Sequence, residues 1–137
     1  EKYYKRYDDS FEKKQEIQEK FKNCMDTIAI IYGEQLPGSY FKGLPLFYSL
    51  YCLVYDLLYG LHGSDNERRI TKSDYPKIRN VLQELETVLE SIEKKDKITP
   101  ENKEVINFIN DYKRHTTNEV VRKRRHKYLI NFMNKYL

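Results

Sequence analysis

One stretch of the sequence, Leu44 to Gly60, is apolar on nearly every face of a helix. Pro45 suits a first helical turn, and Gly60 suits a C-terminal cap. A helix with so little polar surface has to be surrounded by other elements. Because the stretch also holds Asp56 and four tyrosines, it is a poor candidate for a membrane span. We therefore expect a central core helix over about 44–60.

The rest of the chain also has helical patterning. Apolar residues recur every three or four positions over 2–32 and 74–95, and a shorter helix is expected after Thr99-Pro100. Thr116 and Glu119 form a capping-box pattern before a last helix over about 117–136. The residues expected on the packed side of that helix are Val121, Arg125, Tyr128, Leu129, Phe132 and Tyr136. Gly, Pro and small polar residues mark loops over 33–43 and 61–72. The sequence thus predicts one all-α domain over 1–137, about five helices in an irregular bundle around the central hydrophobic helix.

The basic residues are concentrated near the C-terminus. The net charge of the chain is +4, yet 113–127 alone holds seven Lys and Arg against one Glu, a net +6. Such a block is typical of an anion-facing surface or a solvated helix face. Since one helix cannot direct all of them to the same side, we expect Arg122 and Arg125 to be inward or semi-buried, and Lys123, Arg124 and Lys127 to be solvated. The candidate anion- or nucleic-acid-binding residues are Arg114, His115, Thr117, Arg122, Lys123, Arg124, Arg125, His126 and Lys127.

Asp56 is the only formal charge in the central helix. A buried carboxylate needs a cation or several hydrogen-bond donors. We therefore predict a structural ion pair of Asp56 with Arg122 or Arg125, from the dense cation cluster. Tyr48, Tyr51, Tyr55 and Tyr59 share one stripe of the same helix, where packing against neighbouring helices is favoured over a stacking platform for bases.

A catalytic alternative comes from Arg122 and His126, which share a helix face. An imidazole can move a proton while a guanidinium stabilises developing phosphate charge. The pair resembles the Arg/His motif of HEPN ribonucleases, which are also helical bundles. Only Lys123, Arg124 and Arg125 intervene here, fewer than in that family's motif.

Metal and cofactor chemistry has no motif in this sequence. Cys24 and Cys52 lie among apolar residues without CxxC or Cys/His spacing, and the pattern favours reduced thiols in a cytoplasmic protein. Nucleotide-binding and hydrolase signatures are absent. We expect no cofactor and no metal. A generic nucleic-acid-binding helical module remains a further alternative.

Two stretches, 41–61 and 112–132, resemble the C-terminal helical region of a bacterial family with an N-terminal ParB-like, nucleotide-hydrolysing domain, as in GmrSD-type restriction and phage-defence proteins. The matching positions of the second stretch are Arg114, Thr116, Thr117, Asn118, Arg122, Arg125, Tyr128 and Leu129.

The resemblance implies a non-catalytic C-terminal fragment, because the family's Asp-Gly-Gln-Gln-Arg-like signature is absent. The implied partners are the missing N-terminal domain and the DNA or RNA backbone. The Tyr3–Tyr4–Tyr7–Phe11 stripe of the N-terminal helix would then be where the domain meets the rest of the protein or, as a homo-oligomer, a second copy, and no membrane partner is expected.

Overall fold

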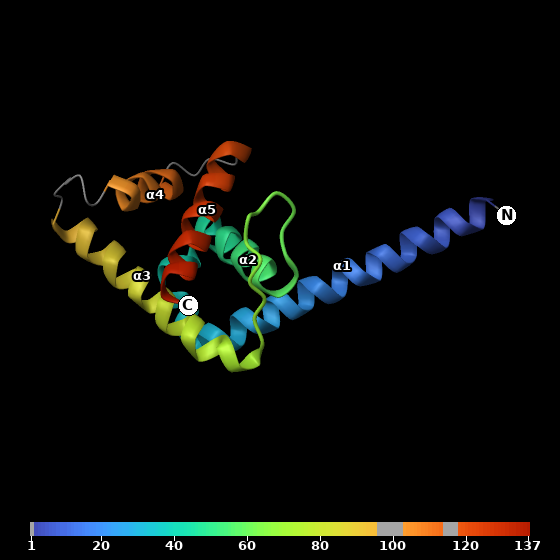
Figure 1. Cartoon of the computed structure of the whole chain (residues 1–137), viewed down its shortest axis with the longest axis horizontal. Coiled ribbons are helices and arrows are strands. Elements are labelled where there is room, and N and C mark those ends of the chain that lie inside the picture. The colour runs from blue at the N-terminus through green and yellow to red at the C-terminus, as the bar shows by residue number, and fades with distance from the viewer. Residues whose placement is uncertain (1, 96–102, 114–117) are drawn as a thin grey trace.

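The computed structural model describes residues 2–95, 103–113 and 118–137, with side chains described for 12–94, 103–113 and 118–137. Within these residues every regular element is a helix and no strand is present, which confirms the predicted all-α class (Figure 1). The elements are α1 (Lys2–Tyr32), η1 (Gly33–Gly38), η2 (Tyr40–Lys42), α2 (Leu44–Tyr59), η3 (Lys72–Asp74), α3 (Tyr75–Lys95), α4 (Lys103–Lys113) and α5 (Glu119–Tyr136), where η is a 3-10 helix.

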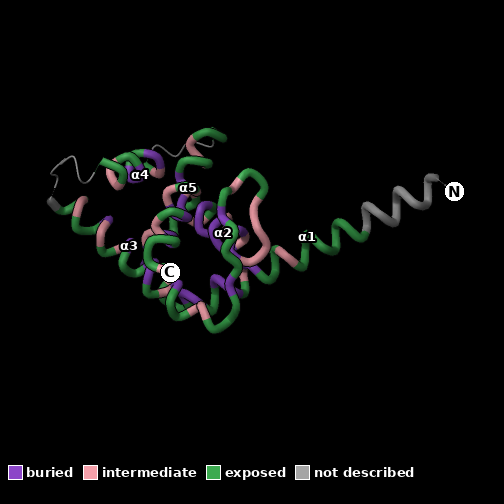
Figure 2. The backbone as a smooth tube through the Cα atoms, viewed as in Figure 1, coloured by how far each residue is buried: buried purple, intermediate pink, exposed green. Residues whose placement is uncertain are grey.

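Helix α2 forms the centre of the core, as its sequence predicts. Leu50, Leu53, Val54 and Leu57 are at most 1% exposed, and α1 and α5 both pack against this helix. Figure 2 shows the buried residues gathered around α2 and the ends of its neighbours. The helix ends at Gly60, whose φ is +85° and whose missing Cβ leaves room for the guanidinium of Arg69. Glycine is needed there for both reasons.

Helices α3, α4 and α5 close the bundle around α2. The apolar stripe of α3 is buried at Ile78, Leu82, Leu85 and Leu89. Helix α4 packs mainly on α5 (Figure 1). Helix α5 begins after Asn118, whose side chain accepts a hydrogen bond from the Val120 N–H. The predicted caps at Thr99 and Thr116 lie outside the described residues.

Helix α1 divides into two parts with different surroundings. Its C-terminal part is buried through Cys24, Ile28 and Ile31. Its N-terminal half projects away from the bundle, and every side chain from residue 12 to 19 is exposed (Figures 1 and 2). Ile17 is 67% exposed and Phe21 is 54% exposed. No helix in the described part of the chain is long and apolar enough to cross a membrane.

Two predictions about local structure are wrong. The segment 33–43, predicted as a loop, folds into η1 and η2, and the Tyr40 N–H donates to Glu86 Oε1 of α3 at 2.9 Å. Tyr136, predicted on the packed side of α5, is 50% exposed, because the buried stripe of this helix runs through Arg125, Leu129 and Met133.

Candidate functional site

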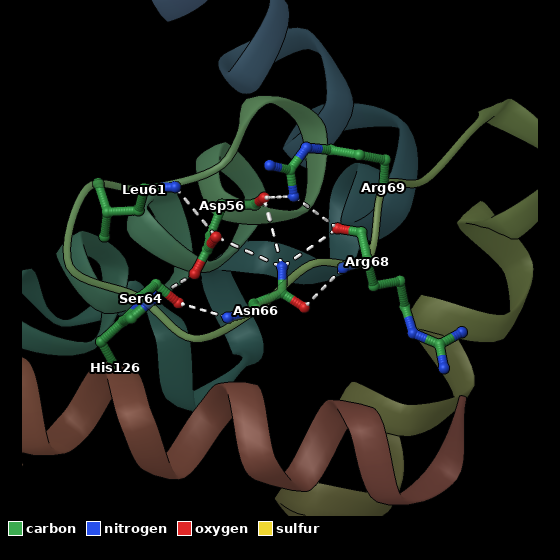
Figure 3. Close-up of polar contacts among 7 residues, drawn as sticks. All are labelled: Asp56, Leu61, Ser64, Asn66, Arg68, Arg69 and His126. Atoms are coloured by element: carbon green, nitrogen blue, oxygen red, sulfur yellow. Dashed lines mark hydrogen bonds and ion pairs between the residues drawn. The ribbon is translucent and has the colours of Figure 1, made fainter.

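The candidate site is built around Asp56, in the last turn of α2. Its side chain is fully buried. Oδ1 accepts hydrogen bonds from the Leu61 N–H at 3.0 Å and from Asn66 Nδ2 at 3.3 Å (Figure 3). The Asn66 amide also donates to the Arg68 carbonyl at 3.1 Å. Asp56 therefore holds the loop after α2 against the C-terminal end of that helix.

The partner of Asp56 on α5 is a histidine and not an arginine. His126 Nε2 of α5 lies 2.7 Å from Asp56 Oδ2. The predicted pair with Arg122 or Arg125 is wrong, because both guanidinium groups lie elsewhere: Arg125 contacts Ser49, and Arg122 lies over the ring of Tyr48. Asp56 is satisfied by the imidazole and the loop donors together.

The pKa of Asp56 reflects these contacts. Burial alone raises the pKa of a carboxyl group, because it disfavours the charged form. Hydrogen bonds from Ser64, His126, the Leu61 N–H and Asn66 outweigh this effect, and the pKa of Asp56 lies below its usual value. The carboxylate is thus ionised at neutral pH despite being buried.

Arg125 has a structural role in the core, as the inward orientation predicted for it suggests. It is 2% exposed, and it donates from Nε to Ser49 Oγ and from Nη1 to the Asp111 carbonyl, each at 3.1 Å. That carbonyl lies in the last turn of α4, where carbonyls lack helical partners. Burial lowers the pKa of Arg125, and the nearby Asp111 partly offsets this. Arg125 therefore connects α2, α4 and α5.

Two further cations of the basic run already have carboxylate partners. Arg124, expected to be only solvated, is 57% exposed but donates to both carboxylate oxygens of Asp111, at 3.1 and 2.7 Å. Lys123 pairs with Glu119 at 3.0 Å on the surface of α5. Arg122 and Lys127 form no ion pair with the described residues.

These remaining cations border a pocket of about 510 Å³ between α2, the following loop and α5. The Arg122 guanidinium carbon lies 5.7 Å from the centre of the Tyr48 ring. Tyr48 is 44% exposed, unlike the half-buried Tyr51, Tyr55 and Tyr59 of the same stripe. The pocket lining includes Tyr48, Cys52, Leu61, Arg122, Lys127 and Ile130, together with the carboxylates of Asp65 and Glu119.

His126 forms part of the pocket wall. Its side chain is 12% exposed, and its Nδ1 is buried with no hydrogen-bond partner among the described residues. Neither ring nitrogen is therefore displayed to a ligand in this arrangement. No group of three or more His, Cys, Asp or Glu in the described part of the chain could hold a metal ion.

The structure brings together only part of the predicted site. Arg122, Lys123, His126 and Lys127 line the pocket, while Arg124 and Arg125 are held by α4. Arg114, His115 and Thr117 lie outside the described residues. The sequence did not identify Asn66, which donates to Asp56, or Asp111, which accepts from Arg124. Both are polar residues that can hydrogen-bond to a charged group, and the sequence holds no other signal for them.

Comparisons with protein-family models, with curated proteins and with solved structures find no match to this chain.

Proposed function

We propose that this chain is a non-catalytic helical module of a ParB-like, GmrSD-type cytoplasmic defence protein, and that its pocket contacts the phosphate backbone of nucleic acid. The observation that carries the backbone contact is the position of Arg122 and Lys127 beside one pocket, without a carboxylate partner among the described residues. Cations in such a position can replace the counterions of a phosphate chain.

The remaining basic residues explain why the proposed contact is local. Arg125 is buried, Arg124 is bound by Asp111 and Lys123 by Glu119. The net +6 of the sequence block therefore overstates the charge that a ligand would meet. A contact with few phosphates gives modest affinity with a correspondingly small salt dependence.

Binding of a fluorescein-labelled single-stranded DNA 20-mer, measured by anisotropy over a range of salt, tests this proposal. The double variant Arg122→Gln/Lys127→Gln removes two phosphate contacts, so the slope of log affinity against log salt should fall by about 1.4. The matched control is Lys77→Gln/Lys135→Gln, two exposed lysines away from the pocket. Salt-insensitive binding, or equal slopes for the two double variants, would contradict the proposal.

Helix α1 is the proposed surface for assembly, either with the rest of the protein or with a second copy. A helical segment without tertiary contacts has little stability of its own. The projecting half of α1 nevertheless exposes Ile17, and Phe21, where α1 meets the bundle, is 54% exposed although its ring lies 5.6 Å from the ring of Tyr51. Sedimentation velocity should detect self-association that Ile17→Lys abolishes. A chain that stays monomeric at all concentrations would exclude the second copy.

Ribonuclease activity is the second candidate, because Arg122 and His126 line the same pocket and Asp56 orients the imidazole. The arrangement of His126 weighs against it, because Nδ1 is buried and Nε2 is engaged by Asp56. RNA cleavage that is lost in both His126→Ala and Arg122→Gln would establish this activity and would overturn the non-catalytic assignment. An inactive wild-type protein would dismiss it.

A further inference from the structure

The pocket beside α5 has a second kind of lining besides its cations. Cys52, Leu61 and Ile130 provide apolar surface, and Ile130 is only 6% exposed. The exposed Lys123 and Lys127 belong to the same pocket. One cavity thus offers apolar surface and cations to a single ligand, a combination that a phosphate ion alone would not use. The carboxylates of Asp65 and Glu119 also line it, and Glu119 is paired with Lys123.

Tyr48 and Arg122 add two flat groups to this pocket. Tyr48 is 44% exposed as a residue, and its phenol ring has the Arg122 guanidinium over it, with 5.7 Å between guanidinium carbon and ring centre. Aromatic rings and guanidinium planes are the surfaces on which unpaired bases stack. Tyr51, Tyr55 and Tyr59 contact each other in series along α2 instead, so only Tyr48 of the stripe lines the pocket.

From these features we infer that the pocket binds one nucleotide of a single-stranded nucleic acid, with its base against Tyr48 and its phosphates at Arg122 and Lys127. This inference rests on the proposed backbone contact and makes it specific. The volume of about 510 Å³ is that of a small-molecule site and accommodates one nucleotide. A base inside a duplex remains stacked and paired, so it cannot enter.

The test compares a labelled single-stranded DNA 12-mer with the 12-base-pair duplex of the same sequence, at one salt concentration. Backbone contact alone favours the duplex, because its charge density is higher. The inference predicts the opposite order, with the single strand bound about tenfold more tightly, a factor within the range of one base–aromatic stack. Equal affinity, or preference for the duplex, overturns it.

Two variants at one position identify the source of the preference. Tyr48→Leu should lower single-strand affinity about tenfold and leave duplex affinity unchanged, while Tyr48→Phe, which keeps the ring, should match the wild type. Unchanged single-strand affinity in Tyr48→Leu overturns the inference but leaves the backbone contact intact. Absence of binding to either DNA form overturns the proposed function itself. If Tyr48→Leu does not fold, the strand preference of the wild-type protein still decides.

Discussion

Replacing Asp56 by alanine should destabilise the protein strongly. The carboxylate is fully buried and accepts hydrogen bonds from His126 Nε2 at 2.7 Å and from the Leu61 N–H at 3.0 Å. Asn66 keeps another acceptor, the Arg68 carbonyl, so Ser64, His126 and the Leu61 N–H lose their partner. Removing one member of a buried pair typically costs about 3–5 kcal/mol. For a chain of this length, that corresponds to a drop in Tm of about 10–20 °C.

Thermal unfolding followed by far-UV circular dichroism measures this effect. Asp56→Asn keeps an acceptor for the Leu61 N–H and should lose less, about 1–2 kcal/mol. The matched control is Asp65→Ala, an exposed aspartate in the same loop, expected within about 0.5 kcal/mol of the wild type. If Asp56→Ala melts at the same temperature as Asp65→Ala, the anchoring role of Asp56 is refuted.

Three further predictions concern stability. The pKa of Asp56 in the folded protein lies below the unfolded value of about 3.9. The stabilisation that its carboxylate provides is therefore complete above pH about 3.9 and is lost as the pH falls through the folded-state pKa. An acid titration of Asp56→Asn should lack this loss. Arg125→Ala should lower the free energy of unfolding, measured by urea titration, by about 3–5 kcal/mol. The substitution leaves a cavity and removes the hydrogen-bond donor of the Asp111 carbonyl at the end of α4. An unchanged urea midpoint would contradict the role of Arg125 in capping α4. Burial raises the pKa of Glu86, and Glu86→Gln still accepts from the Tyr40 N–H, so this variant should raise the Tm at pH 7 and leave it unchanged at pH 4. A lower Tm at pH 7 would show that the charge itself is needed.

The architecture follows from patterns that lie within single elements. The position of helix α2 is predictable because a helix without a polar face has to be enclosed by other elements, whichever elements these are. The inward orientation of Arg125 is likewise predictable, since consecutive residues on one helix diverge in direction. Such arguments need only the geometry of one helix.

The partners of the charged residues depend on contacts between elements, which the sequence does not specify. Asp56 meets His126 rather than an arginine because the packing of α5 on α2 places Arg125 against Ser49. The capture of Arg124 by Asp111 depends in the same way on where α4 ends. A block of charge in a sequence therefore predicts a basic segment, while the fold decides which of its cations stay available.

An NMR titration of the labelled protein with a single-stranded DNA 12-mer tests the central claim most directly. The account predicts that amide shift changes concentrate in 61–65 and 119–127, around the pocket between α2 and α5. They should decrease in Arg122→Gln/Lys127→Gln and persist in Lys77→Gln/Lys135→Gln. Shift changes that concentrate on α1 or α3, or none at all, would contradict the account.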